Sequence, residues 1–506
     1  MTEPAAREGA ITGALYQFLA TSSSFIAGSL FYIYLAKFYT PTDVGNVALL
    51  LATVGIFGSI FSLGLSQASQ HFISYYLGKG QFSKIRAFVF RTITYGTVSS
   101  LVAMLSLIIL SSYISGVFFH TLSFTGTIQL LSVYLFASIM FGILSGILLG
   151  MQRFRRAAIV SIFTSTLSYG MAGMLLFEYH TDEMIVLGWM IGYTLGAMLL
   201  AISAIHLSKK HPKELQRHSY REVMLYSSPI LFSGIIGTSA AYIDRFVVAF
   251  FINVATLGIY NFVLLVSTAL SLFLSPLYNV LLPKLSELFS HQDKESIIRG
   301  MKLSTNLINL IYVPAALGAA ALSGRIIILL SQTQYLSATL PMAIFLIISA
   351  MFITSGVLAQ TVSSIRKTPI FILSASATLA SNIILSIFLI PAFGTTGAAL
   401  SNSSVTVLSF FILLWYTKLN GYSGLDFIAV MKVWFAAGTM AVVVYIASTG
   451  MPGNVTYLAI LIALGIIVYL TLARVARIFS TDDKEWLRQL FGGKHSILYS
   501  LIERLF

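Results

Sequence analysis

The sequence contains no cysteine and very little charge. Without cysteine there are no disulfides, no thiolate metal sites and no cysteine nucleophile. Charged residues make up 9% of the 506 residues, whereas an ordinary soluble domain has roughly 25%. Hydrophobic residues make up 57%, and the mean hydropathy is +0.88. Such a composition is typical of proteins embedded in a membrane.

Apolar runs recur along the whole chain, and about 14 of them are long enough to span a membrane as helices. A hydrocarbon core about 30 Å thick requires roughly 20 apolar residues per helix. The sequence therefore predicts an all-α, polytopic membrane protein with about 14 transmembrane helices. The predicted spans are 10–36, 44–77, 88–110, 127–150, 157–177, 184–207, 223–252, 258–282, 303–322, 340–362, 368–390, 395–417, 431–449 and 455–474.

Positive charge collects in the segments between alternate pairs of these runs. All but three of the 30 Lys and Arg fall on one side, and the exceptions are Lys37, Arg245 and Arg325. Short loops rich in Lys and Arg stay in the cytoplasm. We therefore expect a multi-pass protein of the cell membrane with both termini cytoplasmic. The net charge of +13 favours anionic lipid surfaces, and no nucleic-acid partner is expected.

The loops are too short to form a soluble catalytic domain. The largest irregular outer segment, 323–340, contains an apolar run that we expect along the membrane interface, with Arg325 as an interfacial anchor. Two basic cytoplasmic segments, around 82–89 and 297–301, each carry an apolar face. This pattern predicts two short interfacial helices.

The chain contains a duplicated half. Residues 1–207 and 223–417 each hold six predicted spans, and 208–222 forms a basic cytoplasmic linker. Aligning Gly45 with Gly258 also aligns Arg86 with Arg299 and Arg153 with Arg366. Because six is even, both halves enter the membrane from the same side. A parallel repeat predicts two lobes related by a pseudo-two-fold axis along the membrane normal, with a cavity between them. Residues 418–478 add two helices, and 479–506 form a basic cytoplasmic tail.

Several motifs in this order resemble the multidrug/oligosaccharidyl-lipid/polysaccharide exporter superfamily, and within it the polysaccharide transporters that flip lipid-linked oligosaccharides. The motifs are Tyr39 to Gly45, Gly150 to Arg155, Asp244-Arg245, Leu257 to Tyr260 and Pro391 to Ala399. The resemblance covers essentially the whole chain. It implies two six-helix lobes with two extra helices, alternating access, and energy from an ion gradient or membrane potential.

Two ionisable residues, Asp244 and Arg245, lie inside the seventh predicted span. Such residues are costly in a bilayer and are functional candidates for that reason. Neighbours on a helix do not face one another, so at least one of them needs a partner on another helix. In a functional interpretation Arg245 contacts a lipid pyrophosphate and Asp244 binds a coupling cation or proton. In a structural interpretation the pair locks one lobe, for example through Lys37.

Uncharged polar residues form stripes along three spans. A cavity lined with hydroxyls and amides suits a sugar-rich head group, whose hydroxyls need partners once dehydrated. Small and hydroxyl residues also serve helix contacts in membranes, so a functional and a structural interpretation of these stripes both stay open. The same two interpretations apply to Lys37, which can snorkel to the interface, and to His71, which can be a hydrogen-bonded structural residue. The candidate substrate- or ion-binding residues are Asp244, Arg245, Lys37, His71, Gln17, Ser24, Gln67, Gln70, Ser271 and Asn279.

Four prolines interrupt or flank spans of the second half: Pro229, Pro276, Pro314 and Pro391. Proline removes a backbone hydrogen bond and kinks a helix. Bending sites for gating and simple helix irregularity are both consistent with this placement.

No enzyme signature is found in the sequence. There is no Walker loop and no pairing of His with carboxylates at metal-ligand spacing. Glu178, Asp182 and Glu183 cluster with His180 on an outer loop, an arrangement that is typical of a solvated loop but also conceivable in a membrane glycosyltransferase, polymerase or ligase. We therefore expect a protein that is not an enzyme and has neither cofactor nor metal.

Together these patterns predict a flippase that moves a polyprenyl-linked oligosaccharide across the cytoplasmic membrane. Its expected partners are that lipid, membrane lipids and a coupling ion (H⁺ or Na⁺), and we expect it to act as a monomer. One alternative is a cation-coupled multidrug exporter of the same superfamily. Another is a membrane-embedded glycan polymerase or ligase, which would need essential acids on the outer loop.

Overall fold

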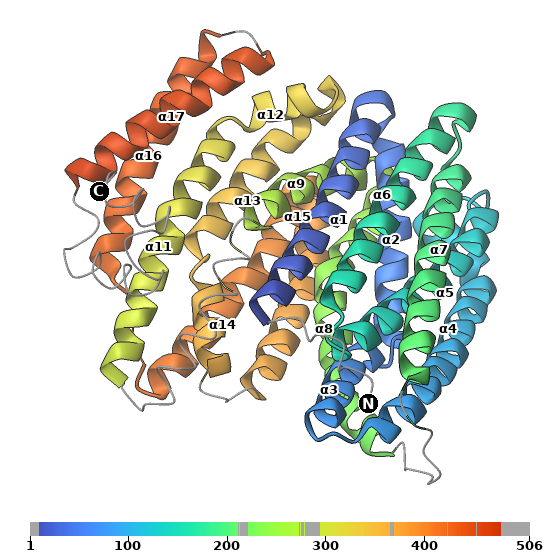
Figure 1. The fold of residues 1–506 in the computed structure, drawn as a ribbon. Coiled ribbons are helices and arrows are strands. Elements are labelled where there is room, and N and C mark those ends of the chain that lie inside the picture. The colour runs from blue at the N-terminus through green and yellow to red at the C-terminus, as the bar shows by residue number, and fades with distance from the viewer. Residues whose placement is uncertain are drawn as a thin grey trace. The chain divides into compact units, whose positions relative to one another are not determined.

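In the computed structural model every regular element is a helix among the residues that it describes, which are 10–210, 212, 221–272, 274, 278, 294–364, 369–422, 424–451 and 453–476. Figure 1 shows the helices in chain order. The predicted all-α class is confirmed. The candidate Asn279, the aligned Arg366, the tail 479–506 and most of the linker 208–222 lie outside the described residues.

The chain forms two compact units, residues 1–261 and 262–506. The boundary falls inside a helix and differs from the predicted lobe limits, so the division into lobes 1–207 and 223–417 stays a prediction. The helices of the first unit are α1 (Ala10–Phe38), α2 (Pro41–Phe61), α3 (Leu65–Gly78), α4 (Phe82–Phe118), α5 (Thr125–Gly150), α6 (Phe154–Tyr179), α7 (Asp182–Lys209), α8 (Arg221–Phe251) and the beginning of α9 (Val254–Leu272).

Three glycines fix the packing of α7 against α6. Gly188, Gly192 and Gly196 recur every four residues and so lie on one face of α7. A Cβ at Gly188 would overlap the backbone of Ala172, and one at Gly196 would overlap the hydroxyl of Thr164. Small residues allow membrane helices to approach to backbone contact. The stripe therefore makes α6 and α7 a close pair within the first unit.

The second predicted span, 44–77, is divided into two helices. α2 ends at Phe61 and α3 begins at Leu65, while Leu63 (φ 51°) and Gly64 (φ 63°) adopt left-handed backbone conformations. Such a conformation is costly for Leu and ordinary for Gly. The hydroxyl of Ser99 on α4 donates to the carbonyl of Phe61 at 2.5 Å. One carbonyl freed by the break therefore has a partner.

The N-termini of α2 and α9 are built alike. The side chain of Thr40 accepts from the backbone N–H of Asp43 to cap α2, and that of Asn253 accepts from Thr256 at 2.8 Å to cap α9. The alignment that pairs Gly45 with Gly258 also pairs Thr40 with Asn253. Equivalent caps at equivalent positions support the internal repeat.

The contact between α2 and α9 is reciprocal. A Cβ at Gly45 would overlap the carbonyl oxygen of Val254, and one at Gly258 would overlap that of Pro41. Pro41 and Val254 are themselves equivalent in the repeat. Gly45 of the first half thus contacts Val254 of the second, and its equivalent Gly258 contacts Pro41, the equivalent of Val254. Two contacts exchanged in this way require a two-fold axis between them. The predicted pseudo-two-fold is thus visible within the first unit.

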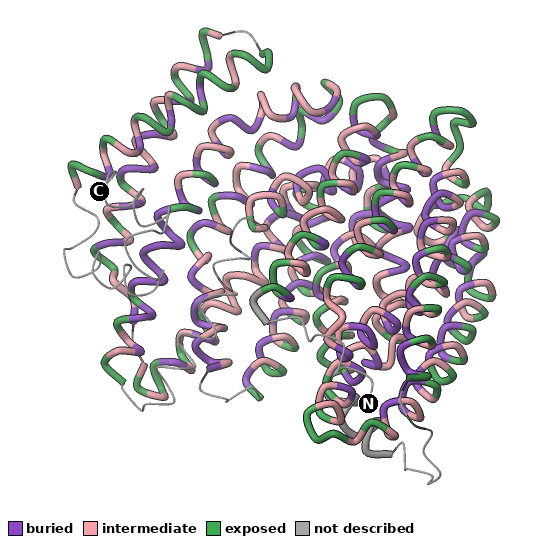
Figure 2. The backbone as a smooth tube through the Cα atoms, in the orientation of Figure 1, coloured by how far each residue is buried: buried purple, intermediate pink, exposed green. Residues whose placement is uncertain are grey.

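The second unit completes α9 and adds the remaining helices. The predicted span 340–362 is divided here as well, into α13 and α14. Exposed residues follow many of its helices, as in the first unit (Figure 2), which suits contact with lipid. The remaining elements are α11 (Lys294–Ala321), α12 (Ser323–Leu330), η1 (Thr333–Ala338), α13 (Thr339–Met351), α14 (Ser355–Ser364), α15 (Pro369–Leu419), α16 (Phe427–Thr449) and α17 (Val455–Val475).

α15 is a helical hairpin rather than one rod. Its 51 residues would extend about 77 Å if straight, more than twice the hydrocarbon thickness. Gly394 breaks the helix with φ 59° and ψ −130°, a conformation almost restricted to glycine. The hydroxyls of Ser381 and Ser404 then meet at 3.1 Å. Thirteen helices among the described residues can cross a membrane, and counting both arms of α15 gives the 14 spans that were predicted.

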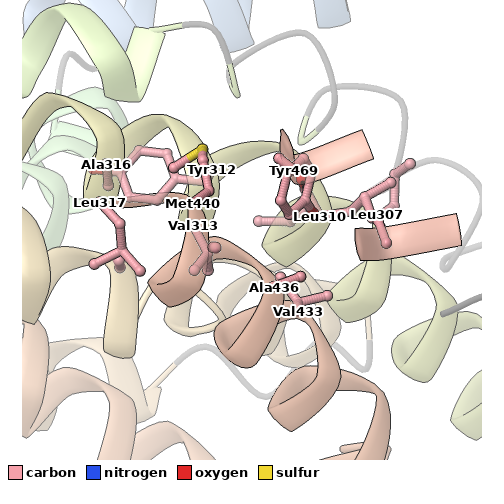
Figure 3. Close-up of a cluster of buried hydrophobic side chains, with 14 of the residues drawn as sticks. Leu307, Leu310, Tyr312, Val313, Ala316, Leu317, Val433, Ala436, Met440 and Tyr469 are labelled. Carbon is pink, nitrogen blue, oxygen red and sulfur yellow. Dashed lines mark hydrogen bonds between the residues drawn. The ribbon is translucent and has the colours of Figure 1, made fainter. Parts of the chain in front are cut away.

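A core of apolar side chains joins α11 to the two C-terminal helices (Figure 3). Pro314 in α11 has no N–H, so the carbonyl of Leu310 lacks its helical donor. The hydroxyl of Tyr469 on α17 donates to that carbonyl at 2.9 Å. The irregularity at Pro314 therefore serves as an attachment point for α17.

The structure corrects one expectation about the membrane surface and adds partners for Arg325. Residues 82–89 and 297–301 do not form separate interfacial helices, because they are the first turns of α4 and α11. No glycine or proline occurs between 82 and 95 to stop α4. Arg325, expected as an interfacial anchor, donates to the carbonyls of Ser448 and, at 2.6 Å, Met451. It thereby caps the C-terminus of α16, where a cation is favourable.

Candidate functional site

Asp244 lies in the membrane-spanning part of α8 and is completely buried. Its carboxylate accepts a hydrogen bond from the hydroxyl of Tyr260 on α9 and another, at 2.9 Å, from the backbone N–H of Arg245. Burying a carboxylate is tolerable only when it is hydrogen-bonded. Asp244 therefore ties α8 to α9 across the turn that joins them.

Arg245 faces a different environment from Asp244, because adjacent helical positions diverge by about 100°. Its guanidinium carbon lies 4.4 Å from the ring centroid of Tyr242, within range of a cation–π interaction. Its Nε is buried and finds no hydrogen-bond partner among the described residues. Buried polar groups are almost always paired, so this unpaired N–H makes Arg245 a candidate for contacting a ligand.

Five tyrosines from five helices of the first unit interact with one another, and two of them, Tyr32 and Tyr242, interact with Arg245. Tyr32 interacts electrostatically with Arg245 and Tyr242 and hydrogen-bonds with Asn261. Tyr134 and Tyr193 pack edge to face, with ring centroids 5.1 Å apart, and Tyr169 interacts with Tyr32, Tyr193 and Tyr242. We call this set the tyrosine cluster: Tyr32 (α1), Tyr134 (α5), Tyr169 (α6), Tyr193 (α7) and Tyr242 (α8).

The tyrosine cluster is not evident from the sequence pattern, because tyrosines in apolar spans resemble ordinary hydrophobic residues there. A signal was nevertheless present. Tyrosine is enriched at membrane interfaces, whereas each of these five lies more than one turn from the nearer end of its helix. Deep tyrosines in several spans of one half would have indicated a shared polar interior.

The predicted candidates on α1 are spread along the helix. Lys37 is exposed at the end of α1, and Ser24 and Gln17 are half-buried further along it.

After α1, the hydroxyl of Tyr39 donates to the carbonyl of Leu176 at 3.1 Å. Burial raises the pKa of Tyr39 to about 12, so the hydroxyl stays protonated and keeps this bond near neutral pH.

The candidates of the second span lie on α3, beyond the break at Leu63 and Gly64. His71 and Gln67 are exposed and Gln70 is half-buried. The ring of His71 stacks on that of Tyr75, with centroids 6.5 Å apart. Cations and aromatic rings recur at this end of α3, and the ammonium of Lys79 lies 4.5 Å from the same Tyr75 ring. His71 thus belongs to an aromatic, basic surface rather than to the tyrosine cluster.

Ser271 lies in the second unit. Its hydroxyl donates to the carbonyl of Ser267 at 3.3 Å and lies 3.5 Å from the hydroxyl of Tyr312. The hydroxyl of Tyr312 in turn lies 3.1 Å from that of Ser349. Ser271 therefore takes part in a hydroxyl chain that links helices of the second unit.

Of the acids around the turn between α6 and α7, Asp182 makes a contact to another helix. Asp182 begins α7, and its carboxylate accepts from the amide of Asn46 on α2 at 2.9 Å. Glu178 and Glu183 are exposed beside it. No group of three or more metal-ligating side chains occurs within the described part of the chain. Asp182 thus joins α7 to α2.

The site combines one cation with phenolic rings inside an apolar bundle. A guanidinium with an unpaired N–H recognises the oxygens of phosphate groups. Phenolic hydroxyls donate and accept hydrogen bonds, and the ring faces offer flat apolar surface. This chemistry suits an amphipathic ligand that carries both anionic oxygens and hydroxyl-bearing rings.

A model of one protein family, described as polysaccharide biosynthesis protein, matches residues 10–289, which is more than half of the chain. The chain belongs to the polysaccharide biosynthesis protein family. An uncharacterized membrane protein of Methanocaldococcus jannaschii is 23% identical over 433 residues, which cover 80% of this chain and 83% of that protein.

Solved structures show which fold this chain adopts. It is similar to the lipid II flippase MurJ in an inward closed conformation, with a TM-score of 0.73 and 18% identity over 92% of this chain and 99% of that one. It is also similar to an inward-facing multidrug resistance MATE family transporter of the MOP superfamily, with a TM-score of 0.64 and 12% identity over 81% and 95%. The predicted polysaccharide family is confirmed by the family match, and these two structures show the fold of the chain.

Proposed function

We propose that this protein translocates a polyprenyl-linked oligosaccharide from the cytoplasmic to the outer leaflet of the cell membrane by alternating access. The observation that carries the proposal is Arg245, whose buried Nε has no partner among the described residues and which interacts with Tyr32 and Tyr242 of the tyrosine cluster. The family supports it, as does the likeness to a flippase fold over 92% of the chain.

Each part of such a substrate has a counterpart in the site. The diphosphate binds the guanidinium of Arg245, because Arg pairs well with phosphate oxygens. Sugar hydroxyls exchange their water for the hydroxyls of the tyrosine cluster, and sugar rings lie against its aromatic faces. Sugars dehydrated inside a bundle need such partners.

We assign Asp244 to positioning rather than to ion coupling. Its carboxylate is enclosed and bonded to Tyr260, so a coupling cation would first have to displace that hydroxyl. Asp244 thus holds α8 where Arg245 meets the cluster. Transport would draw on an ion gradient or the membrane potential through other groups, and both termini would lie in the cytoplasm.

The competing functions differ in their substrate. A multidrug exporter would move amphipathic cations, which the positive charge of Arg245 repels. The similarity to the MATE transporter covers 81% of this chain, compared with 92% for the flippase. A glycan polymerase or ligase would require the outer acids, of which Asp182 is bonded to Asn46.

The test measures translocation of a fluorescent polyprenyl diphosphate oligosaccharide in vesicles containing the purified protein. Arg245→Ala should slow it by about ten- to a hundredfold, since a hydrogen bond to a charged group is worth about 1.5–3 kcal/mol. Arg245→Lys should restore part of the rate, because the charge remains but the planar fork is lost. Arg156→Ala, at an exposed cation on α6, is the matched control and should behave like the native protein.

Genetic complementation, scored as export of surface glycan, can contradict the proposal. If alanine at both Asp244 and Arg245 still supports export of surface glycan at normal expression, the site is wrongly assigned. If amide replacements at Glu178, Asp182 and Glu183 abolish function while translocation in vesicles persists, an enzymatic role gains support instead.

A further inference from the structure

A narrow groove of about 480 Å³ runs along the first unit between α1 and α6. Its lining is almost entirely apolar and includes Leu30 and Tyr34 on α1 and Gly170, Gly173 and Phe177 on α6. Its volume lies within the range of small-molecule sites. The two glycines leave notches one helical turn apart, a spacing close to that of the methyl branches along an isoprenoid chain.

The groove is elongated along the helices. On α6 its lining runs from Thr166 to Phe177, which corresponds to about 16 Å, or half of the hydrocarbon core. It ends close to Tyr179, at the helix end predicted to lie outside. Such a groove accepts a chain lying parallel to the membrane normal within one leaflet.

The groove opens to the surface of the unit and adjoins the tyrosine cluster. Leu30 and Phe177 are 62% and 68% exposed, so an occupant enters sideways from the bilayer. On the inner side the rings of Phe31 and Tyr169 lie 5.7 Å apart and line the groove. Tyr169 is a member of the tyrosine cluster and interacts with Tyr32, which interacts with Arg245. One aromatic wall therefore separates the groove from the head-group site.

We propose that this groove binds the isoprenoid chain of the transported lipid while its head group occupies the site at Arg245. This assignment rests on the proposed function. The bilayer is as apolar as the groove, so the chain is held by close contacts rather than by the hydrophobic effect. The groove keeps the chain beside the head group and confines it to the leaflet at the Tyr179 end.

Photo-crosslinking in vesicles tests the assignment. The probe is undecaprenyl diphosphate with a diazirine on its chain, and the products are mapped by mass spectrometry. Labelling is expected in residues 27–34 and 166–177. Unlabelled undecaprenyl diphosphate should compete for it, and phosphatidylglycerol at the same concentration should not.

Gly170 allows the groove to be filled without disturbing the fold. No atom of the described residues outside its own helix lies within 4 Å of a Cβ built at Gly170, so Gly170→Leu extends into open space. It should lower labelling about fivefold, because leucine removes the contacts that hold the chain. Gly438→Leu on α16, where a Cβ also meets open space, is the matched control and should label like the native protein.

The outcomes separate this assignment from the proposed function. Equal competition by phosphatidylglycerol, or unchanged labelling in Gly170→Leu, would show an ordinary bilayer lipid in the groove and overturn the assignment. So would absence of labelling there while the same vesicles translocate glycolipid, a result that leaves the proposed function intact. Specific labelling without any translocation would support the groove and contradict the proposed function alone.

Discussion

At the scale of single residues, the bond between Tyr260 and Asp244 explains how a carboxylate persists inside an apolar span. The carboxylate is fully buried, and the phenol belongs to the next helix and is itself buried. Removing one partner of a buried polar pair leaves the other unsatisfied, which costs more than the bond itself contributes. The pair therefore fixes the geometry of the α8–α9 turn from which Arg245 is presented.

Replacing Tyr260 with phenylalanine should destabilise the protein by about 1–3 kcal/mol, because the Asp244 carboxylate loses a donor. Thermal unfolding in detergent measures the effect. Tyr113→Phe, at a residue that is 66% exposed, is the control. Adding Asp244→Asn to Tyr260→Phe should recover part of the loss, since an amide tolerates burial better than a charge. Equal melting temperatures of Tyr260→Phe and the native protein would refute the structural role of the Tyr260–Asp244 bond.

At the scale of helices, close packing in this protein depends on glycine. Along α7 the glycines at 188, 192 and 196 meet the backbone and hydroxyls of α6. Without a hydrophobic driving force between membrane helices, close van der Waals contact has to hold them together. A single methyl group placed in that contact must push two helices apart.

Gly188→Ala should therefore destabilise the first unit by about 1–3 kcal/mol, the usual cost of overpacking, although alanine favours helix more than glycine does. Gly438→Ala is the control, because its Cβ meets no atom outside its own helix within 4 Å in the described structure. It should leave stability unchanged or raise it slightly. Thermal unfolding of the two variants gives the comparison. A Gly188→Ala variant with the melting temperature of the native protein would mean that α6 and α7 are not tightly packed.

At the scale of the whole molecule, the repeat and the charge asymmetry define how the chain is organised. The exchanged contacts of Gly45 with Val254 and of Gly258 with Pro41 locate a pseudo-two-fold axis. Such an axis along the membrane normal is the arrangement used for alternating access. The sidedness of the protein depends on a separate property, the distribution of Lys and Arg.

The absence of native cysteine makes sidedness directly measurable. Ser123→Cys, on the turn between α4 and α5, should react with a membrane-impermeant maleimide on intact cells. Lys210→Cys, just after α7, should react only after permeabilisation, because basic loops stay in the cytoplasm. The native chain offers no thiol and serves as the blank. Reversed accessibility would overturn the predicted orientation.

Part of the candidate site at Arg245 follows from the sequence and part does not. The deep positions of Asp244 and Arg245 are evident from the span around them, since a charge in an apolar run stands out locally. Their partners are not evident. Tyr260 lies 16 residues from Asp244, and the tyrosine cluster draws on five helices. No local pattern determines which faces of those helices converge.

The number of spans and the hairpin break near Gly394 follow from the sequence, because span length and backbone preference depend on neighbouring residues. The tertiary structure adds three features that no local pattern shows: the break of the second predicted span at Leu63 and Gly64, the bond from Tyr469 to the carbonyl freed by Pro314, and the aromatic wall between the α1–α6 groove and Arg245. Each of these depends on side chains that are distant in sequence, and packing alone brings them together.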